Sequence, residues 1–499
     1  MRKTFLTLIS VVALAFLVAC GGGWSNNNHN KNVLAPTAPA GGNSAGFSDS
    51  SFKGNYVFAV NGITRGKTLA VAGIFTADGD GNITSGTRDT VYDSGSQSLS
   101  EPITGSYSVN QDGRGLVTLN GSSGTVYYLF VLSSPSAGKL FQNGTASESV
   151  VVDAIGRLEL QTSTSTTLAG SYVVRLDGED SGKLPYGAVG GLTASGSTLT
   201  GSIDENDAGT FSPSLAVSAG SYSLSANGRG TASYATATGP NTAAHNFIVY
   251  YVSPSRLELI STDPKFWLHG YADLQTSVDG TVASFIGDQV FNISGSDSRG
   301  NPVQETGRFT LSAGSLSNGF ADYNDGGLLY TDTPFNGIYT VAPSGRWQAT
   351  LDYTSFASSL GLVGWQVSPQ QSLVLTTSST QLETGDMRAQ TLGLTTIAGE
   401  YAEYYSGYNG GSGNLESTGN LLAAGGTLSG FVDEQTDSSG FQGNIPVSGS
   451  YTIDPIYGRG SGYIGTKPVA IYTVSADTIY LFSVDSNSLY QGTLTLQTP

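Results

Sequence analysis

The chain has 499 residues, of which 38 are acidic and 21 are basic, so its formal net charge is −17. This excess of acid argues against a nucleic-acid partner, because phosphate binding needs clustered Lys and Arg. Only 12% of the residues are charged, whereas 68 are Gly and 26 are Tyr. Since Gly costs about 1 kcal/mol relative to Ala inside a helix, this composition predicts strands joined by tight turns.

The first 19 residues have the pattern of a secretory signal peptide. Arg2 and Lys3 precede a nearly continuous apolar run over residues 5–16. Even when it is extended to Ala19, the run is shorter than the roughly 20 residues that a helix needs to cross a bilayer. We therefore expect residues 1–19 to be removed during export.

The signal ends at Cys20, the only cysteine of the chain, so an intramolecular disulfide is impossible. Residues 17–20, Leu-Val-Ala-Cys, resemble the lipobox of bacterial lipoproteins. The resemblance implies that Cys20 carries a lipid that includes palmitate. This lipid would anchor the mature chain to a membrane. Gly21 after the cysteine implies sorting to the outer membrane or cell surface. An ordinary secretory signal with an incidental cysteine is the alternative.

Residues 20–50 are dominated by Gly, Asn, Ser, Ala and Pro. Such a segment buries too little apolar surface to offset its ordering entropy. We interpret it as a flexible tether between the lipid and the folded body.

The folded body is a fourfold repeat of about 115 residues. A Gly-x-Tyr motif followed by a Gly-Arg turn recurs with its tyrosines at Tyr107, Tyr222, Tyr339 and Tyr451. A Gln-Thr pair closes each unit, at Gln161, Gln275, Gln390 and Gln497. An Asp recurs at Asp89, Asp204, Asp322 and Asp433. We place the units at residues 51–164, 165–280, 281–393 and 394–499.

Each unit reads as about eight short strands separated by Gly, Pro, Asn or Asp. The spacing between strands leaves no room for crossover helices, so neighbours should pair antiparallel as a meander. The sequence therefore predicts an all-β protein of four tandem domains, each a small up-and-down barrel or a two-sheet sandwich. We favour the barrel, because a meander that closes has no free edges. One large transmembrane barrel from all the strands is a third alternative.

The sequence contains few candidates for catalysis or metal binding. Its histidines are His29, His245 and His269, too few for a histidine-rich metal site, and no nucleophile-elbow motif accompanies them. The Asp78–Asn82 segment lacks acids at the first and last ligand positions of a calcium loop, so we interpret it as a hairpin turn. No cofactor motif is present, and we expect neither a cofactor nor a metal.

The recurring Asp and Gly-Arg residues are interpreted as fold residues, because an active site is built once whereas these recur in every unit. We expect the Asp to stabilise a turn and the Arg to pack or pair locally.

Tyrosines give the one candidate binding site. Tyr404, Tyr405 and Tyr408 cluster at the start of the fourth unit, where the second repeat has no aromatic residue. Exposed tyrosines stack on sugars or contact partner proteins. Ordinary core and sheet-surface positions are the alternative.

These features predict a non-enzymatic surface lipoprotein that binds a polysaccharide or an envelope protein, or that has a structural role. The alternative is an envelope glycan hydrolase that uses carboxylates of one repeat. In overall plan the chain resembles uncharacterised tandem-β lipoproteins of Gram-negative bacteria, a resemblance that supplies no activity.

The lipidation prediction is tested by Cys20→Ala. Because the acyl acceptor is lost, metabolic labelling with a palmitate analogue should leave this variant unlabelled, whereas the parent chain is labelled. Label retained on Cys20→Ala would contradict the prediction.

Overall fold

The computed structural model describes residues 46–64, 67–93, 95–145, 152–239, 241–354, 358–410 and 413–499. The predicted signal peptide, Cys20, His29 and most of the predicted tether lie outside these residues. The described residues form 33 strands and one short helix, η1 (Asp49–Ser51). Within these ranges, no helix has the length and apolar character needed to cross a membrane.

The first barrel is built from nine strands. In chain order they are β1 (Lys53–Thr64), β2 (Lys67–Asp78), β3 (Asn82–Tyr92), β4 (Gln97–Pro102), β5 (Thr104–Val109), β6 (Arg114–Gly121), β7 (Gly124–Ser134), β8 (Ala137–Thr145) and β9 (Val152–Leu160). The sheet closes because β1 pairs with both β2 and β9, and β2 pairs with β3. Strand β3 then pairs with β4 along one half and with β5 along the other. Together β4 and β5 thus occupy one place in an eight-place barrel.

The other three barrels each have eight antiparallel strands in sequence order. The second contains β10 (Gly170–Asp180), β11 (Pro185–Ser195), β12 (Thr198–Asp207), β13 (Thr210–Leu224), β14 (Arg229–Thr236), β15 (His245–Ser253), β16 (Arg256–Ser261) and β17 (Phe266–Leu274). The third contains β18 (Gly287–Asp297), β19 (Pro302–Ser312), β20 (Ser315–Asp325), β21 (Leu328–Val341), β22 (Arg346–Tyr353), β23 (Ser358–Ser368), β24 (Gln371–Thr376) and β25 (Gln381–Ala389). The fourth contains β26 (Gly399–Asn409), β27 (Gly413–Ala424), β28 (Thr427–Thr436), β29 (Gly440–Ile453), β30 (Arg459–Ile464), β31 (Lys467–Thr473), β32 (Thr478–Ser483) and β33 (Ser488–Leu496).

The predicted all-β fold of tandem meander barrels is confirmed. The sandwich and the single barrel made from all strands, which the sequence left open, are not formed. Each barrel has its own apolar core of inward-facing side chains. The repeated tyrosine of the Gly-x-Tyr motif closes one barrel end, because its hydroxyl bonds to a backbone oxygen of the segment that enters the barrel. The acceptors of Tyr107, Tyr222, Tyr339 and Tyr451 are the carbonyls of Asp49, Leu168, Phe285 and Ile397.

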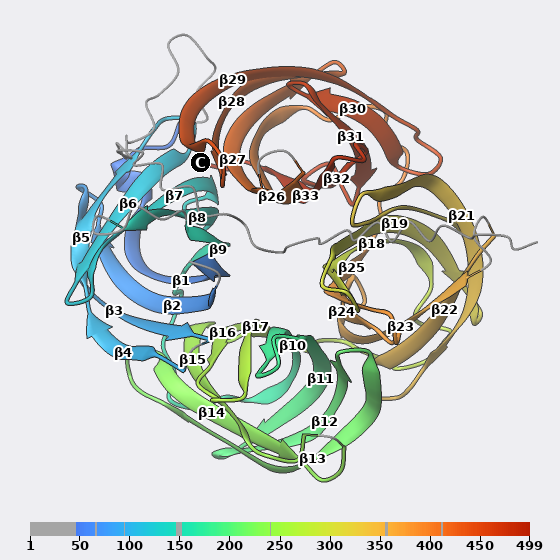
Figure 1. Cartoon of the computed structure of the whole chain (residues 1–499), viewed down its shortest axis with the longest axis horizontal. Helices are drawn as coiled ribbons and strands as arrows, with labels where there is room; N and C mark the ends of the chain where they lie inside the picture. Colours follow the sequence, from blue (N-terminus) through green and yellow to red (C-terminus); the bar gives the residue numbers. More distant parts are fainter. Residues whose placement is uncertain are drawn as a thin grey trace, which may run out of the picture.

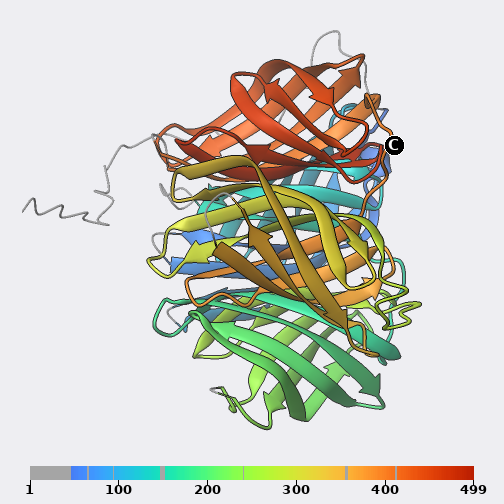
Figure 2. The ribbon, with the colours of Figure 1, turned by 90° about the vertical axis from the view of Figure 1, so that its right-hand side faces the viewer.

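The four barrels stand in a closed ring around a central space (Figure 1). Seen from the side, the ring is one barrel deep (Figure 2). The described ends of the chain meet at the contact between the fourth and first barrels, where the Thr498 N–H donates to the Ser133 carbonyl. We call each contact between neighbouring barrels a seam.

Every seam contains the same ion pair, between the recurring Asp of one barrel and the recurring Arg of the next. The pairs are Asp89–Arg229 at 2.7 Å, Asp204–Arg346 at 2.7 Å, Asp322–Arg459 at 2.7 Å and Asp433–Arg114 at 3.1 Å. The expectation that the Arg pairs locally holds in part: Arg114 contacts Asp112 two residues away, but the partner that all four arginines share is the Asp across the seam. The Asp does also stabilise its own strand connection: its carboxylate accepts a backbone N–H from Ser100, Ser214, Asp332 or Asn444.

The closing glutamine of each unit makes a second contact across the same seam. Its amide donates to two carbonyls of the next barrel: Gln161 to Asn227 and Tyr251, Gln275 to Ser344 and Gln366, Gln390 to Tyr457 and Thr473, and Gln497 to Asp112 and Leu132. The turn glycine before each Arg makes room for this amide. A Cβ at Gly228, which has φ +87°, would lie 2.4 Å from the Gln161 nitrogen.

Apolar clusters reinforce the first three seams. Val57 and Tyr250 share one cluster, Val189 and Trp365 a second, and Val290 and Tyr472 a third. At the fourth seam the Arg114 side chain is fully buried, and its guanidinium also donates to Asp112 and Asn444. A charge that is buried away from water loses its hydration, so its stability depends on the oppositely charged partner.

This dependence is tested at the fourth seam. Arg114→Met should lower the free energy of unfolding, measured with denaturant, by about 3–5 kcal/mol, because Asp433 would keep a buried charge without a partner. Arg114→Met/Asp433→Leu should recover part of the loss. Arg299→Met is the control, since that side chain is 72% exposed and should matter little. Equal losses in the single and double variants would contradict the prediction.

Candidate functional site

A cavity of about 930 Å³ lies at the centre of the ring and is lined by residues of all four barrels. Its wall is made chiefly by β7, β8 and β9 of the first barrel and by the first strand and the last two strands of each of the other three barrels, which border the central space in Figure 1. By contrast, the spaces inside the first and second barrels are only about 10 and 40 Å³, because core side chains fill them. The centre of the ring is thus the place where the described residues leave room for a ligand.

Strand alternation decides which side chains reach this cavity. In β10, Val174 and Leu176 point into the barrel core, so Arg175 and Asp177 point out of the barrel and into the cavity. In β26 the same alternation buries Tyr405 in the core and places Tyr404 and Ser406 on the cavity wall. The cavity is therefore lined by the outward faces of strands whose inward faces hold the barrels together.

The repeat symmetry is lost on the cavity wall. The pairs between first and last strands at equivalent register positions are Ala59–Arg157, Arg175–Tyr271, Asn292–Asp386 and Tyr404–Thr493, and all of these residues except Ala59 line the cavity. Two residues further along the first strand, the pairs are Asn61–Ile155, Asp177–His269, Ser294–Thr384 and Ser406–Gln491, of which all but Asn61 and His269 line the cavity. The Asp, Arg and Gln of the seams, in contrast, recur in all four units. The fold therefore does not dictate the residues that line the cavity.

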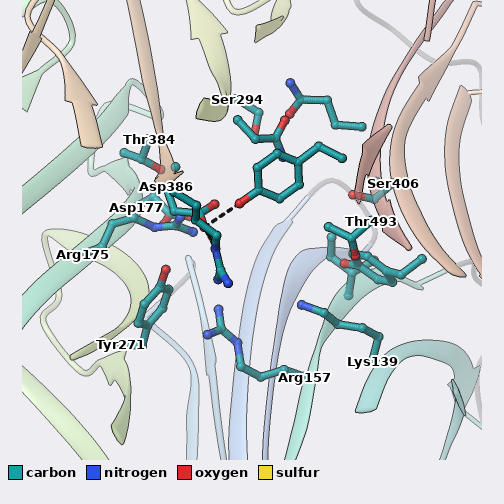
Figure 3. A pocket seen from close by; sticks show the side chains of 18 of the residues that line it. Lys139, Arg157, Arg175, Asp177, Tyr271, Ser294, Thr384, Asp386, Ser406 and Thr493 are labelled. Carbon is teal, nitrogen blue, oxygen red and sulfur yellow. Dashed lines mark hydrogen bonds and ion pairs between the residues drawn. The ribbon is translucent and has the colours of Figure 1, made fainter. Parts of the chain in front are cut away.

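Tyr271 is the centre of a charged cluster on one side of the cavity (Figure 3). The guanidinium carbons of Arg157, Arg175 and Arg256 lie 4.3, 5.1 and 3.8 Å from its ring centre, within the range of cation–π contacts.

Arg256 also joins three carboxylates. It lies 3.7 Å from Glu159, 3.1 Å from Glu258 and 2.6 Å from Asp273. Burial raises the pKa of Glu159 to about 7, and the neighbouring Glu258 adds to this rise. Burial likewise raises the pKa of Glu258 to about 7, with Asp273 contributing. Near neutral pH these two carboxyls therefore carry less than their full negative charge.

Lys139 lies on the wall of the first barrel, with its ammonium 5.3 Å from the ring centre of Tyr404 in the fourth barrel. Burial lowers the pKa of Lys139 to about 8, and the cation of Arg157 lowers it further. No carboxylate of the described residues lies within ion-pair distance of this ammonium. Figure 3 shows Lys139 and Arg157 projecting from the same side toward the open centre.

The structure separates the three tyrosines of the sequence-predicted site. Tyr404 lines the central cavity. Tyr405 is 1% exposed in the core of the fourth barrel, where its hydroxyl contacts Glu434 and Lys467. Tyr408 is 39% exposed and does not line the cavity. Ligand binding by this cluster stays a prediction, but its three rings do not share one surface.

Sequence reasoning missed Lys139, Arg157, Arg175, Tyr271 and Arg388 as residues of one site. Each is an isolated residue in a strand, and the five come from three different repeats. The signal that could have found them is the comparison of equivalent positions between repeats, applied to the first strand and the last two strands of every unit.

The histidines of the described residues do not form a Ser-His-Asp arrangement. His245 is buried in the second barrel against Tyr234 and Phe266. His269 Nε2 lies 2.8 Å from Asp177. No serine hydroxyl of the described residues is hydrogen-bonded to either imidazole. The same part of the chain contains no group of three or more His, Cys, Asp or Glu placed to hold a metal ion.

The fold and the cavity together define a class of protein: a closed ring of four tandem β-barrels around a shared central cavity. No family model and no curated protein matches the sequence.

Among solved structures, a double mutant of the vaccine antigen transferrin binding protein B from Haemophilus parasuis is similar over 72% of this chain and 82% of that one, at 10% identity and a TM-score of 0.17. Intact Ap-TbpB, with its N and C lobes, is similar over the same shares, at 8% identity and a TM-score of 0.16. Both likenesses are distant, so the role of the cavity has to follow from its own residues.

The different surroundings of the tyrosines predict different effects of truncation. Tyr405→Ala should lower the free energy of unfolding by about 3–5 kcal/mol, because it leaves a cavity in a packed core. Tyr408→Ala should leave the unfolding free energy nearly unchanged, since this side chain is 39% exposed and lies outside the barrel core. Denaturant titration of the two variants measures both effects, and similar midpoints would contradict the placement of Tyr405 in the core.

Proposed function

We propose that this protein is an exported, lipid-anchored, non-enzymatic binding protein whose ligand, a saccharide, occupies the central cavity. The observation that carries the proposal is the loss of repeat symmetry on the wall of a cavity of about 930 Å³. This volume lies within the range of ordinary ligand pockets. Four copies of one unit require the same seam residues, but nothing in the fold requires a different set of side chains on each side of the cavity.

The chemistry of the wall supports a polar ligand with a ring. Tyr404 offers a partly exposed aromatic ring, and Ser294 and Ser406 offer accessible hydroxyl groups. Aromatic faces stack on the apolar side of a sugar ring, while charged and hydroxyl side chains bond to its hydroxyl groups. The lipid predicted on Cys20 would hold such a ring at a membrane, where envelope polysaccharides are within reach.

A glycan hydrolase remains the second candidate, and one observation favours it. Glu159 and Glu258 have pKa values raised to about 7, as a general acid needs. Against this role, Glu258 is 2% exposed and both carboxylates contact arginines. Hydrolysis would release reducing ends from a bound glycan, whereas a binding protein would release none.

The proposal is tested with the chain from residue 20 onward, carrying Cys20→Ala so that it stays soluble. On a glycan array this protein should bind a subset of saccharides. Ser294→Trp should abolish that binding, because Ser294 is an exposed residue of the cavity wall and an indole would fill the space. Ser315→Trp is the matched control, since Ser315 is exposed on the same barrel but outside the cavity.

Both variants should keep the melting temperature of the parent protein. Binding that survives Ser294→Trp would place the site elsewhere on the ring. Absence of binding to every saccharide would contradict the proposed ligand class and would favour a protein of the envelope as the partner.

A further inference from the structure

The cavity concentrates positive charge in an acidic protein. Of the 21 basic residues of the chain, five line this one space: Lys139, Arg157, Arg175, Arg256 and Arg388. Four carboxylates, Glu159, Asp177, Asp273 and Asp386, line the same space, but burial raises the pKa of Glu159 and Asp273 to about 7, which weakens their opposing charge near neutral pH. An anion that approaches this protein therefore finds its favourable surface inside the ring.

The five cations are not equally neutralised by the protein. Arg256 contacts three carboxylates, and Arg175 lies 3.4 Å from Asp177. Arg157 has one longer contact, 3.6 Å to Glu258. Arg388 pairs with Asp386 at 2.6 Å, yet its side chain is 40% exposed. Lys139 has no carboxylate partner among the described residues. The least compensated charge thus lies at Lys139, on the wall that it shares with Arg157.

Groups from three barrels surround the Lys139 ammonium. Arg157 and Glu159 come from β9 of the same barrel, Asp386 and Arg388 from β25, and the ring of Tyr404 from β26. A cationic group beside an aromatic ring and exposed hydroxyls is suited to a sugar that carries an acidic substituent, because ring and charge are recognised together.

Resting on the proposed function, we propose that the ligand of the central cavity is an acidic saccharide. Its anionic group is held by Lys139 with Arg157 and Arg388, and its sugar ring lies against Tyr404. The shared chemistry is a negatively charged oxygen group on a sugar, carried as a uronate carboxylate or as a sulfate ester.

The test uses oligogalacturonate and its methyl ester, which have the same backbone but differ in charge, and a sulfated oligosaccharide as the second acidic probe. Titration calorimetry with the soluble chain should show binding of one acidic probe at least tenfold tighter than that of the neutral ester. The acidic probe that binds identifies the anionic group. Binding of both acidic probes no tighter than that of the neutral ester would overturn the inference.

Lys139→Met should remove this preference, weakening the acidic probe at least tenfold while leaving the neutral ester unchanged. Lys265→Met is the matched control, because Lys265 is exposed and lies outside the cavity. Both variants should unfold at the parent temperature. Retention of the acid preference in Lys139→Met would overturn the inference.

The pH dependence provides a second readout. The pKa of Lys139 is about 8, so its ammonium is charged below that pH and loses its proton as the pH rises through it. Affinity for the acidic probe should therefore fall several-fold between pH 7 and pH 9.5. In Lys139→Arg the fall should be smaller, because a guanidinium stays charged and only the deprotonation of nearby carboxyls such as Glu159, whose pKa is about 7, remains. Glu159 and Asp386 titrate alike in both proteins, so the difference between the two profiles reports Lys139.

The two proposals fail in different ways. Binding of neutral and acidic saccharides with equal strength, blocked by Ser294→Trp, would overturn the acidic ligand and leave the cavity as a saccharide site. Binding of no saccharide would overturn both.

Discussion

The ring depends on one buried interaction, the ion pair between an Asp of one barrel and an Arg of the next. All four aspartates are fully buried in these pairs, so each carboxylate has left water and relies on its arginine partner. A buried charge pair is also directional, because a guanidinium and a carboxylate meet well in few orientations. The pair therefore restricts how neighbouring barrels meet, and the same pair recurs at all four seams of the ring.

Closure has a functional consequence. Each barrel uses its inward faces for its own core and the outer surfaces near its recurring Asp and Arg for the seams. The outward faces of the last two strands of each barrel remain, together with those of β10, β18 and β26, and the ring turns these toward its centre. Since neither core nor seam restricts these positions, they differ in every repeat. The repeats thus supply a scaffold with four non-identical walls, and the combination Lys139, Arg157, Tyr271 and Tyr404 exists only when the barrels are assembled.

The strand pattern was largely predictable because it depends on neighbours in sequence. The second repeat has the eight strands that the sequence predicts for a unit. Its strand β13 begins at Thr210 and continues past Ser214, a residue with φ +50°, because the pairing with β12 shifts register there. The sequence analysis recognised the recurring Asp and Arg as landmarks of the repeat, but it interpreted both as residues with local roles. Asp204 and Arg346 are 142 positions apart, and no local pattern relates residues at that separation.

From the sequence alone came the prediction of an export signal and of a lipid on Cys20, and also the four repeats and their β meander, because each follows from composition, periodicity or spacing along the chain. Tertiary structure alone decided that the meanders close into barrels and that the barrels close into a ring. It also decided that Tyr404 faces a shared cavity while Tyr405 fills a core. The physical reason is that closure depends on side chains more than a hundred residues apart, whose contact becomes visible only when whole sheets pack together.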